Sequence, residues 1–178
     1  MFTMIQKCSL WNVFNVFVAE PLKIHYIKEI SKKINLAPTS VKKHLEYLLE
    51  QKLIFKKKGD IFFGFIANRD NEDFLFYKKI ANIIKLKESG IIKFLINTIY
   101  PQAIIVYGSF LRGEDIEESD IDIFILTNTK KNIETERFEA ILKRRVHIIM
   151  ETSLKKIKDD LKTEIINGLV LYGYLKDG

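Results

Sequence analysis

The sequence predicts an α+β protein built in two parts. Up to residue 51, apolar residues recur at helical spacing, as Trp11, Phe14 and Val18 do in the first segment. Two short apolar runs then flank Lys58-Gly59-Asp60, a combination typical of a β-hairpin. Beyond residue 90, β-branched runs such as Ile104-Ile105-Val106 alternate with helical segments. Helices with a hairpin are therefore expected to precede a small α/β part.

The first part is predicted to contain three helices and the hairpin. Glu20-Pro21 ends the first helix, because proline cannot continue it. In the second helix, Ile27, Ile30 and Ile34 form an apolar face with lysines outside. Pro38 begins the third helix, a position where proline is favoured. The predicted ranges are helices over Leu10–Ala19, His25–Ile34 and 38–51, and strands over Leu53–Lys57 and Ile61–Ala67.

A polar stretch, Asn68 to Asp73, marks the predicted domain boundary. The next helix, Phe74–Lys87, places Phe74, Tyr77, Ile80 and Ile84 on its apolar side and is interpreted as a rigid connector. We thus expect domains at residues 1–70 and 91–178, joined by a connector at 71–90. The ranges predicted beyond it are helices over Ile91–Ile99, Glu134–Lys143 and Leu154–Ile166, and strands over Ile104–Tyr107, Ile121–Leu126, Arg145–Met150 and Leu169–Tyr174.

Composition and charge limit the class of protein. An apolar fraction of 47% suffices for packed cores, which excludes a disordered chain. The single cysteine, Cys8, allows no internal disulfide, and the apolar segment Ser9–Ala19 is too short to span a bilayer. We therefore expect a cytoplasmic protein without membrane contact. Residues 1–70 hold 12 Lys and Arg against 6 Asp and Glu, whereas residues 71–178 hold 17 of each, which favours a nucleic-acid partner for the first part.

The stretch from Ile104 to Leu126 carries the chemistry. A buried strand stops at Gly108-Ser109, where a residue without Cβ lets the backbone approach a ligand and where N–H and hydroxyl groups can bind phosphates. Asp120 and Asp122, two positions apart on the next strand, point to one face and repel each other unless a cation lies between them. Mg²⁺ is held by one or two carboxylates together with substrate phosphates. The alternative is an ordinary solvated strand start beside an acidic run.

This stretch resembles the signature of the DNA polymerase β-type nucleotidyltransferases: Gly-Ser, ten intervening residues, then Asp-x-Asp. It is most similar to the small prokaryotic minimal nucleotidyltransferases, and the resemblance covers about residues 91–174. The fold that this resemblance implies is a small α/β domain with a mixed sheet. The matching residues are Gly108, Ser109, Arg112, Gly113, Ser119, Asp120, Ile121 and Asp122.

The resemblance implies transfer of a nucleotide from an NTP, for which we expect ATP, to an acceptor, with Mg²⁺ or Mn²⁺ as the cofactor. Gly108 and Ser109 would then contact the triphosphate, and Asp120 and Asp122 would hold the metal. Arg112 is a further candidate for the phosphates, although it could equally pair with the neighbouring Glu114 or Asp115.

One position departs from the family pattern. Active members carry a third carboxylate on a following strand, and His147 stands where that residue is expected here. A histidine can act as a general base or bind softer cations, but it does not replace an anionic oxygen ligand of Mg²⁺. It can also be purely structural. If the carboxylate is simply lost, His147→Asp should raise transfer; if His147 is a working base, it should not.

Three helices followed by a basic hairpin resemble a winged helix-turn-helix, with the third helix as the recognition helix. The resemblance implies that residues 1–70 bind double-stranded DNA, with the third helix in the major groove. An ordinary solvated lysine face is the alternative. The residues expected to contact DNA are Thr39, Ser40, Lys42, Lys43, Lys56, Lys57 and Lys58.

Two functional hypotheses stay open. The first is a nucleotidyltransferase whose acceptor is a macromolecule or small molecule; minimal members of the family often modify HEPN-type partner proteins in toxin–antitoxin pairs. The second is a DNA-binding transcription regulator whose second domain binds nucleotide or metal without efficient turnover. A fusion in which DNA binding regulates an active transferase unites the two. A homodimer is an assembly that either hypothesis allows.

Overall fold

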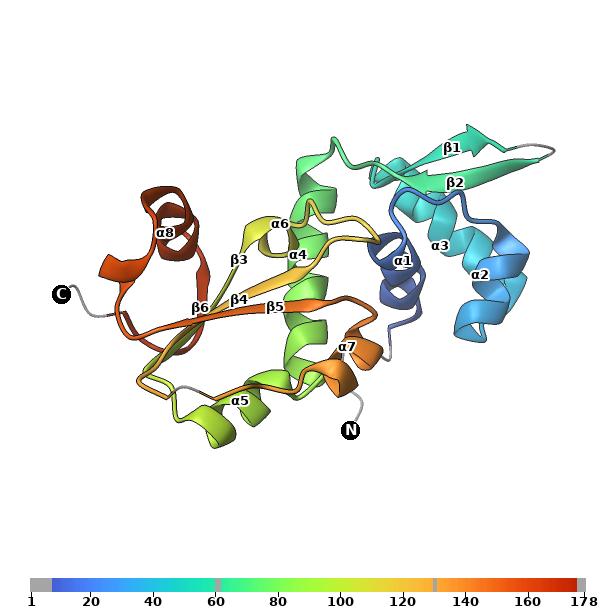
Figure 1. Cartoon of the computed structure of the whole chain (residues 1–178). Helices are drawn as coiled ribbons and strands as arrows, with labels where there is room; N and C mark the ends of the chain where they lie inside the picture. The colour runs from blue at the N-terminus through green and yellow to red at the C-terminus, as the bar shows by residue number, and fades with distance from the viewer. Residues whose placement is uncertain (1–7, 60–61, 130, 176–178) are drawn as a thin grey trace. The chain divides into compact units, whose positions relative to one another are not determined.

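The computed structural model describes residues 8–59, 62–129 and 131–175 (Figure 1). The chain divides into two compact units, residues 1–81 and 82–178. The division falls inside one continuous helix, α4 (Glu72–Glu88). Among the described residues, none of the helices combines the length and the apolar character that a membrane span requires.

The first unit contains the predicted three helices and hairpin. Its core is formed by apolar side chains of the helices, among them Phe17, Ile30 and Leu45, which are all but fully buried. The two strands pair antiparallel, from Ile54 opposite Ala67 to Lys58 opposite Phe63, which confirms the hairpin. Asp60 of the predicted turn and Ile61, the first residue of the predicted second strand, lie outside the described residues. The elements are α1 (Ser9–Ala19), α2 (Ile27–Ile34), α3 (Pro38–Glu50), β1 (Ile54–Lys58) and β2 (Phe63–Ala67).

The prediction that the second helix begins at His25 is wrong. The His25 backbone instead exchanges two hydrogen bonds with Phe65 of β2, at 2.8 and 2.9 Å, and so adds a short bridge to the hairpin. The imidazole is fully buried, and its Nε2 donates to the Glu20 carbonyl at 3.0 Å. Burial lowers the pKa of His25, since it disfavours the charged form. His25 is therefore structural and does not face DNA.

Helix α4 buries a different face from the predicted one. Tyr77 is 41% exposed, whereas Lys78, one position further, is fully buried beside the buried Phe74 and Ala81. The buried face of α4 therefore includes polar side chains, among them Asn82. A search for apolar periodicity does not detect such positions.

The second unit is built on a four-stranded sheet with the order β5-β4-β3-β6. Strands β4 and β5 are parallel and the other neighbours antiparallel, so the sheet is mixed, as expected. Apolar residues of α5 and α7 pack on one face, and those of α8 pack on the other (Figure 1). The elements are α5 (Ile91–Ile99), β3 (Ala103–Tyr107), α6 (Gly108–Arg112), β4 (Ile121–Leu126), α7 (Glu136–Leu142), β5 (Val146–Glu151), η2 (Leu154–Lys156), α8 (Asp159–Ile166) and β6 (Leu169–Gly173).

The single helix predicted over Leu154–Ile166 is wrong, because this segment forms η2 and α8 with a break between them. Ile157 and Lys158 have extended backbone angles, with ψ of 139° and 145°. Local capping favours the break: the Ser153 hydroxyl accepts a hydrogen bond from the Lys155 N–H at the start of η2. Two aspartates in the first turn of α8 favour a separate helix start, since carboxylates stabilise a helix N-terminus.

Candidate nucleotide-binding and catalytic site

The candidate site begins at the turn between β3 and α6. Gly108 directly follows the strand and begins α6, and its φ of +76° is a conformation that L side chains rarely adopt. A Cβ at this position would lie 2.7 Å from Asp122 Oδ2, closer than real Cβ contacts allow. Glycine is therefore required here for two reasons, the backbone conformation and the close approach of a carboxylate. Ser109 follows in the first turn of α6, so the predicted phosphate-binding pair lies directly beside one of the two predicted metal ligands.

Three side chains form a row across the sheet at this end. Tyr107 of β3 lies opposite Asp122 of β4, which in turn lies opposite His147 of β5. His147 Nδ1 and Asp122 Oδ1 are 3.1 Å apart. Because an ionised carboxylate only accepts hydrogen bonds, the imidazole is the donor, and in the neutral imidazole Nε2 is then the acceptor. The two oxygens of Asp122 thus have different neighbours: Oδ2 lies at the glycine turn and Oδ1 at the histidine.

Asp120 has a cationic neighbour of its own. The residue immediately precedes β4, and its Oδ1 accepts a hydrogen bond from Arg145 Nε at 3.0 Å. Both groups are accessible, with exposed side-chain fractions of 39% for Asp120 and 79% for Arg145. A surface pair of this kind contributes little to stability, so a ligand can exchange with the guanidinium at small cost. The sequence did not identify Arg145 as a site residue. Its position two residues before His147 could have suggested that role.

Tyr107 and Glu164 were also not predicted to be site residues. Burial raises the pKa of Tyr107 to about 12, and the carboxylates Asp122 and Glu164 act in the same direction. Glu164 of α8 accepts a hydrogen bond from Arg112 at 3.1 Å, and Glu114 accepts another at 2.7 Å. These pairs raise the pKa of Arg112. Of the two roles expected for Arg112, the structure contains the pairing with Glu114; contact with phosphates stays a prediction.

Buried polar side chains hold the loop between α6 and β4, which carries Asp120. Asn82 Nδ2 donates to the Phe110 carbonyl at 2.9 Å and to Asp115 Oδ1 at 2.8 Å. Arg144 Nη1 donates to the Glu117 carbonyl at 2.6 Å, and its Nη2 lies 3.8 Å from Asp115 Oδ2. Asn82 and Asp115 are both nearly inaccessible to solvent. A residue of α4 and one from the turn between α7 and β5 therefore hold the spacer between Gly-Ser and Asp-x-Asp.

A buried lysine supports the neighbouring helix α7. Lys85 Nζ donates to the carbonyl of Leu142, the last residue of that helix, at 2.6 Å. Burial lowers the pKa of Lys85 to about 8, and the charges of Arg144 and Lys143 add to the effect. The ammonium group satisfies a helix-end carbonyl that has no partner within α7.

The donor set at this end suits one hard cation. Asp120 and Asp122 offer accessible carboxylate oxygens, and the space that a Cβ at Gly108 would fill leaves Asp122 Oδ2 open toward the turn. Mg²⁺ and Mn²⁺ accept two carboxylates when phosphates complete the coordination. Within the described ranges, no group of three or more His, Cys, Asp and Glu side chains is arranged to hold a metal by itself. Phosphate oxygens would therefore have to supply the other ligands.

The residues predicted to contact DNA lie on α3 and β1 of the first unit. Lys42 and Lys43 lie on the exposed face of α3, and Thr39 and Ser40 occupy its first turn. Lys42 lies 3.9 Å from Glu46, one turn further along the helix. The lysines of β1 are all exposed. We call the set Lys42, Lys43, Lys56, Lys57 and Lys58 the basic surface.

Comparisons with known proteins bear on the second unit. Residues 89–176 match the protein family described as "Polymerase beta, Nucleotidyltransferase". A segment of 55 residues is 44% identical to Protein adenylyltransferase MntA of Thermococcus cleftensis, over 28% of this chain and 56% of that protein. The match thus spans little more than half the length of the curated relative. No solved structure matches the chain.

The family match covers α5, the whole sheet and the Gly-Ser and Asp-x-Asp positions, which are the elements that build the site described above. The close approach of Gly108 to Asp122 also gives this signature a physical basis in the present fold. Residues 89–176 are therefore a nucleotidyltransferase domain of the polymerase beta type.

Proposed function

We propose that this chain transfers the adenylyl group of ATP to a hydroxyl of a protein acceptor. The observation that carries the proposal is the row of Tyr107, Asp122 and His147 beside the Gly108 turn. The row would bring together a turn that binds phosphate, a carboxylate that binds metal and a proton acceptor at one end of the sheet. The protein acceptor is inferred from the name of the relative from Thermococcus cleftensis.

The turn and the carboxylates would bind the nucleotide. The Ser109 hydroxyl and the backbone N–H groups of the first turn of α6 would donate to the phosphates. Asp120 and Asp122 would hold Mg²⁺, which supplies charge neutralisation at the phosphate oxygens. Arg145, which now pairs with Asp120, would be free to contact the phosphates once that carboxylate binds the metal.

His147 would accept the proton of the acceptor hydroxyl. Its Nδ1–H is directed to Asp122 Oδ1, which leaves Nε2 of the neutral ring as the base, and its side chain is 56% exposed. The acceptor oxygen then forms a bond to the α-phosphorus, the bond to the β-phosphate oxygen breaks, and pyrophosphate leaves. The hydroxyl proton passes to Nε2. A positioned base of this kind contributes about 10²–10⁴ in rate.

The transfer can be tested with labelled ATP and a partner protein that co-purifies with the chain. ATP carrying its label in the α-phosphate should modify the partner in a Mg²⁺-dependent reaction, and Asp120→Asn or Asp122→Asn should abolish both transfer and metal-dependent ATP binding in calorimetry. Asp160→Asn, an exposed aspartate of α8, is the matched control and should behave as wild type. ATP affinity that is metal-independent and equal in wild type and variants would refute the assignment of the site.

A second candidate is a DNA-binding regulator whose second domain binds nucleotide with little turnover. It is favoured by the absence, within the described residues, of a three-ligand metal group. The variants of His147 separate the two candidates. If His147 is the base, His147→Ala should lose transfer and His147→Asp should not exceed wild type. A His147→Asp variant faster than wild type, with ATP affinity unchanged within a few-fold, would favour the regulator.

We further propose that residues 1–70 bind double-stranded DNA. Support comes from the order of helices and hairpin and from the exposure of the basic surface on α3 and β1. A HEPN-type protein is our proposed acceptor, on the resemblance to minimal nucleotidyltransferases. Regulation of an active transferase by DNA binding would use both units of the chain.

A further inference from the structure

A second pocket opens at the other end of the sheet from the candidate catalytic site. It includes Leu126, the last residue of β4, and Gln102, whose N–H donates to the Leu126 carbonyl at 2.8 Å. Ala103 pairs with Leu126, whereas Tyr107 pairs with Asp122. Four strand positions therefore separate the pocket from the catalytic row, or about 13 Å. The pocket shares no lining residue with the catalytic site.

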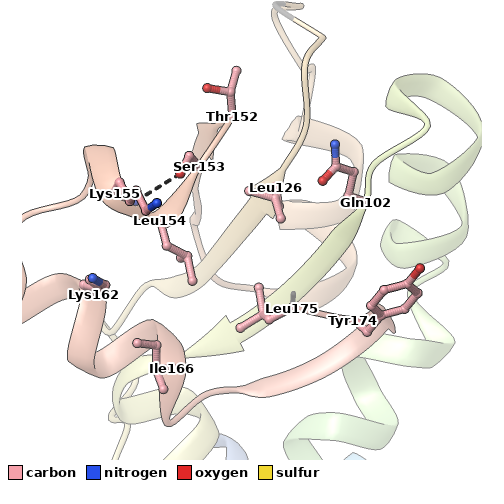
Figure 2. A pocket seen from close by; sticks show the side chains of 10 residues that line it. All are labelled: Gln102, Leu126, Thr152, Ser153, Leu154, Lys155, Lys162, Ile166, Tyr174 and Leu175. Atoms are coloured by element: carbon pink, nitrogen blue, oxygen red, sulfur yellow. Dashed lines mark hydrogen bonds between the residues drawn. The ribbon is translucent and has the colours of Figure 1, made fainter. Parts of the chain in front are cut away.

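The size and lining of the pocket suit a small molecule. Its volume is about 640 Å³, within the range of ligand sites. Leu126, Leu154, Ile166 and Leu175 supply an apolar lining, and Gln102, Thr152 and Ser153 supply polar groups. Figure 2 shows Lys155 and Lys162 on one side and Tyr174 on the other, with the leucines between them.

The charge in this pocket is positive. Among the described residues that line it, Lys155 and Lys162 are cationic and none is acidic. Within the part of the chain that the structure describes, no carboxylate lies within the 4.0 Å ion-pair distance of either ammonium group. An ammonium pair beside an apolar lining complements a ligand with an anionic end and an apolar body.

We propose that this pocket binds a small amphipathic anion, a molecule with a carboxylate, sulfonate or phosphate group on an aromatic or aliphatic body. The anion contacts Lys155 and Lys162, and the body lies over Leu126, Leu154 and Leu175 toward the Tyr174 ring. Lys162 belongs to α8, the helix whose Glu164 pairs with Arg112 near the catalytic turn. A ligand here would thus contact a helix that also reaches the catalytic end. Binding itself does not depend on the proposed transfer activity.

Two fluorescent probes test the proposal on the full chain: anilinonaphthalene sulfonate, which is anionic, and phenylnaphthylamine, its neutral counterpart. The wild type should bind the sulfonate saturably, and Lys155→Ala/Lys162→Ala should weaken that binding about tenfold, as loss of two accessible charge pairs implies. Lys156→Ala/Lys158→Ala is the matched control, because these exposed lysines belong to the same segment but do not line the pocket. It should retain wild-type affinity, and the neutral probe should bind all three proteins alike.

Several results would overturn the proposal. One is the absence of saturable sulfonate binding to the wild type, and another is an equal effect of the two double substitutions on that binding. Loss of the neutral probe together with the anionic one would mean that the substitutions alter the shape of the pocket rather than its charge. Displacement of the sulfonate by ATP with Mg²⁺ would place the probe in the catalytic site. Retained sulfonate binding in the presence of ATP is the expected result.

Discussion

The buried contacts of Asn82 give the sharpest prediction about stability. Asn82→Ala removes the donor that serves both the Phe110 carbonyl and Asp115 Oδ1. A buried acceptor left without a partner costs about 1–3 kcal/mol. Because Asp115 keeps Arg144, which lies 3.8 Å from its Oδ2, the free energy of unfolding should fall by about 2–3 kcal/mol rather than by twice the single cost. For a unit of this size, such a loss lowers the midpoint of thermal unfolding by about 10 °C or more.

Circular dichroism measures the midpoint, and hydrogen exchange with mass spectrometry locates the change. Amides of β3, α6 and β4 should lose protection in Asn82→Ala, because the loop that Asn82 holds joins these elements. Asn97→Ala is the matched control: it is the same substitution on an exposed position of helix α5 and carries the same gain in helix propensity. An Asn82→Ala midpoint no lower than that of Asn97→Ala would refute the reasoning.

Three further predictions concern the turn, the buried lysine and the basic surface. Gly108→Ala should abolish Mg²⁺-dependent ATP binding in calorimetry. Its methyl group would lie 2.7 Å from Asp122 Oδ2, and the residue would have to keep a φ of +76°. An unchanged ATP affinity would contradict this prediction. Burial lowers the pKa of Lys85 to about 8 in the folded state only. The unfolded chain therefore binds more protons above pH 8, so the free energy of unfolding should rise from pH 8 toward 10. Urea unfolding of wild type should show this rise and Lys85→Met should not; a rise of equal size in both would assign it to other groups. Alanine at the five lysines of the basic surface should weaken binding to duplex DNA and flatten its salt dependence in mobility-shift titrations, whereas unchanged titrations would exclude this surface.

The α+β class of fold and a specific hypothesis for the candidate site could both be predicted from the residues alone. Apolar periodicity predicted helices and strands of both units, because an element that buries one face carries apolar residues at a regular spacing. The Gly-Ser and Asp-x-Asp positions could be found because phosphate and metal chemistry restrict residue type at fixed positions. His147 was singled out because the family resemblance places a third carboxylate at its position, and in the structure it pairs with Asp122.

The contacts between distant polar groups could not be predicted in this way, because they depend on how the elements pack. The contact of Asn82 with Asp115 joins positions 33 residues apart, and that of Arg112 with Glu164 joins positions 52 apart. The buried face of α4 was mispredicted for a related reason, since Lys78 and Asn82 are polar and break the apolar pattern. Local spacing records which side of an element is apolar, but it does not record the partner that satisfies a buried polar group. That partner is fixed by how strands and helices pack, and this packing also forms the support of the loop between α6 and β4 and the second pocket.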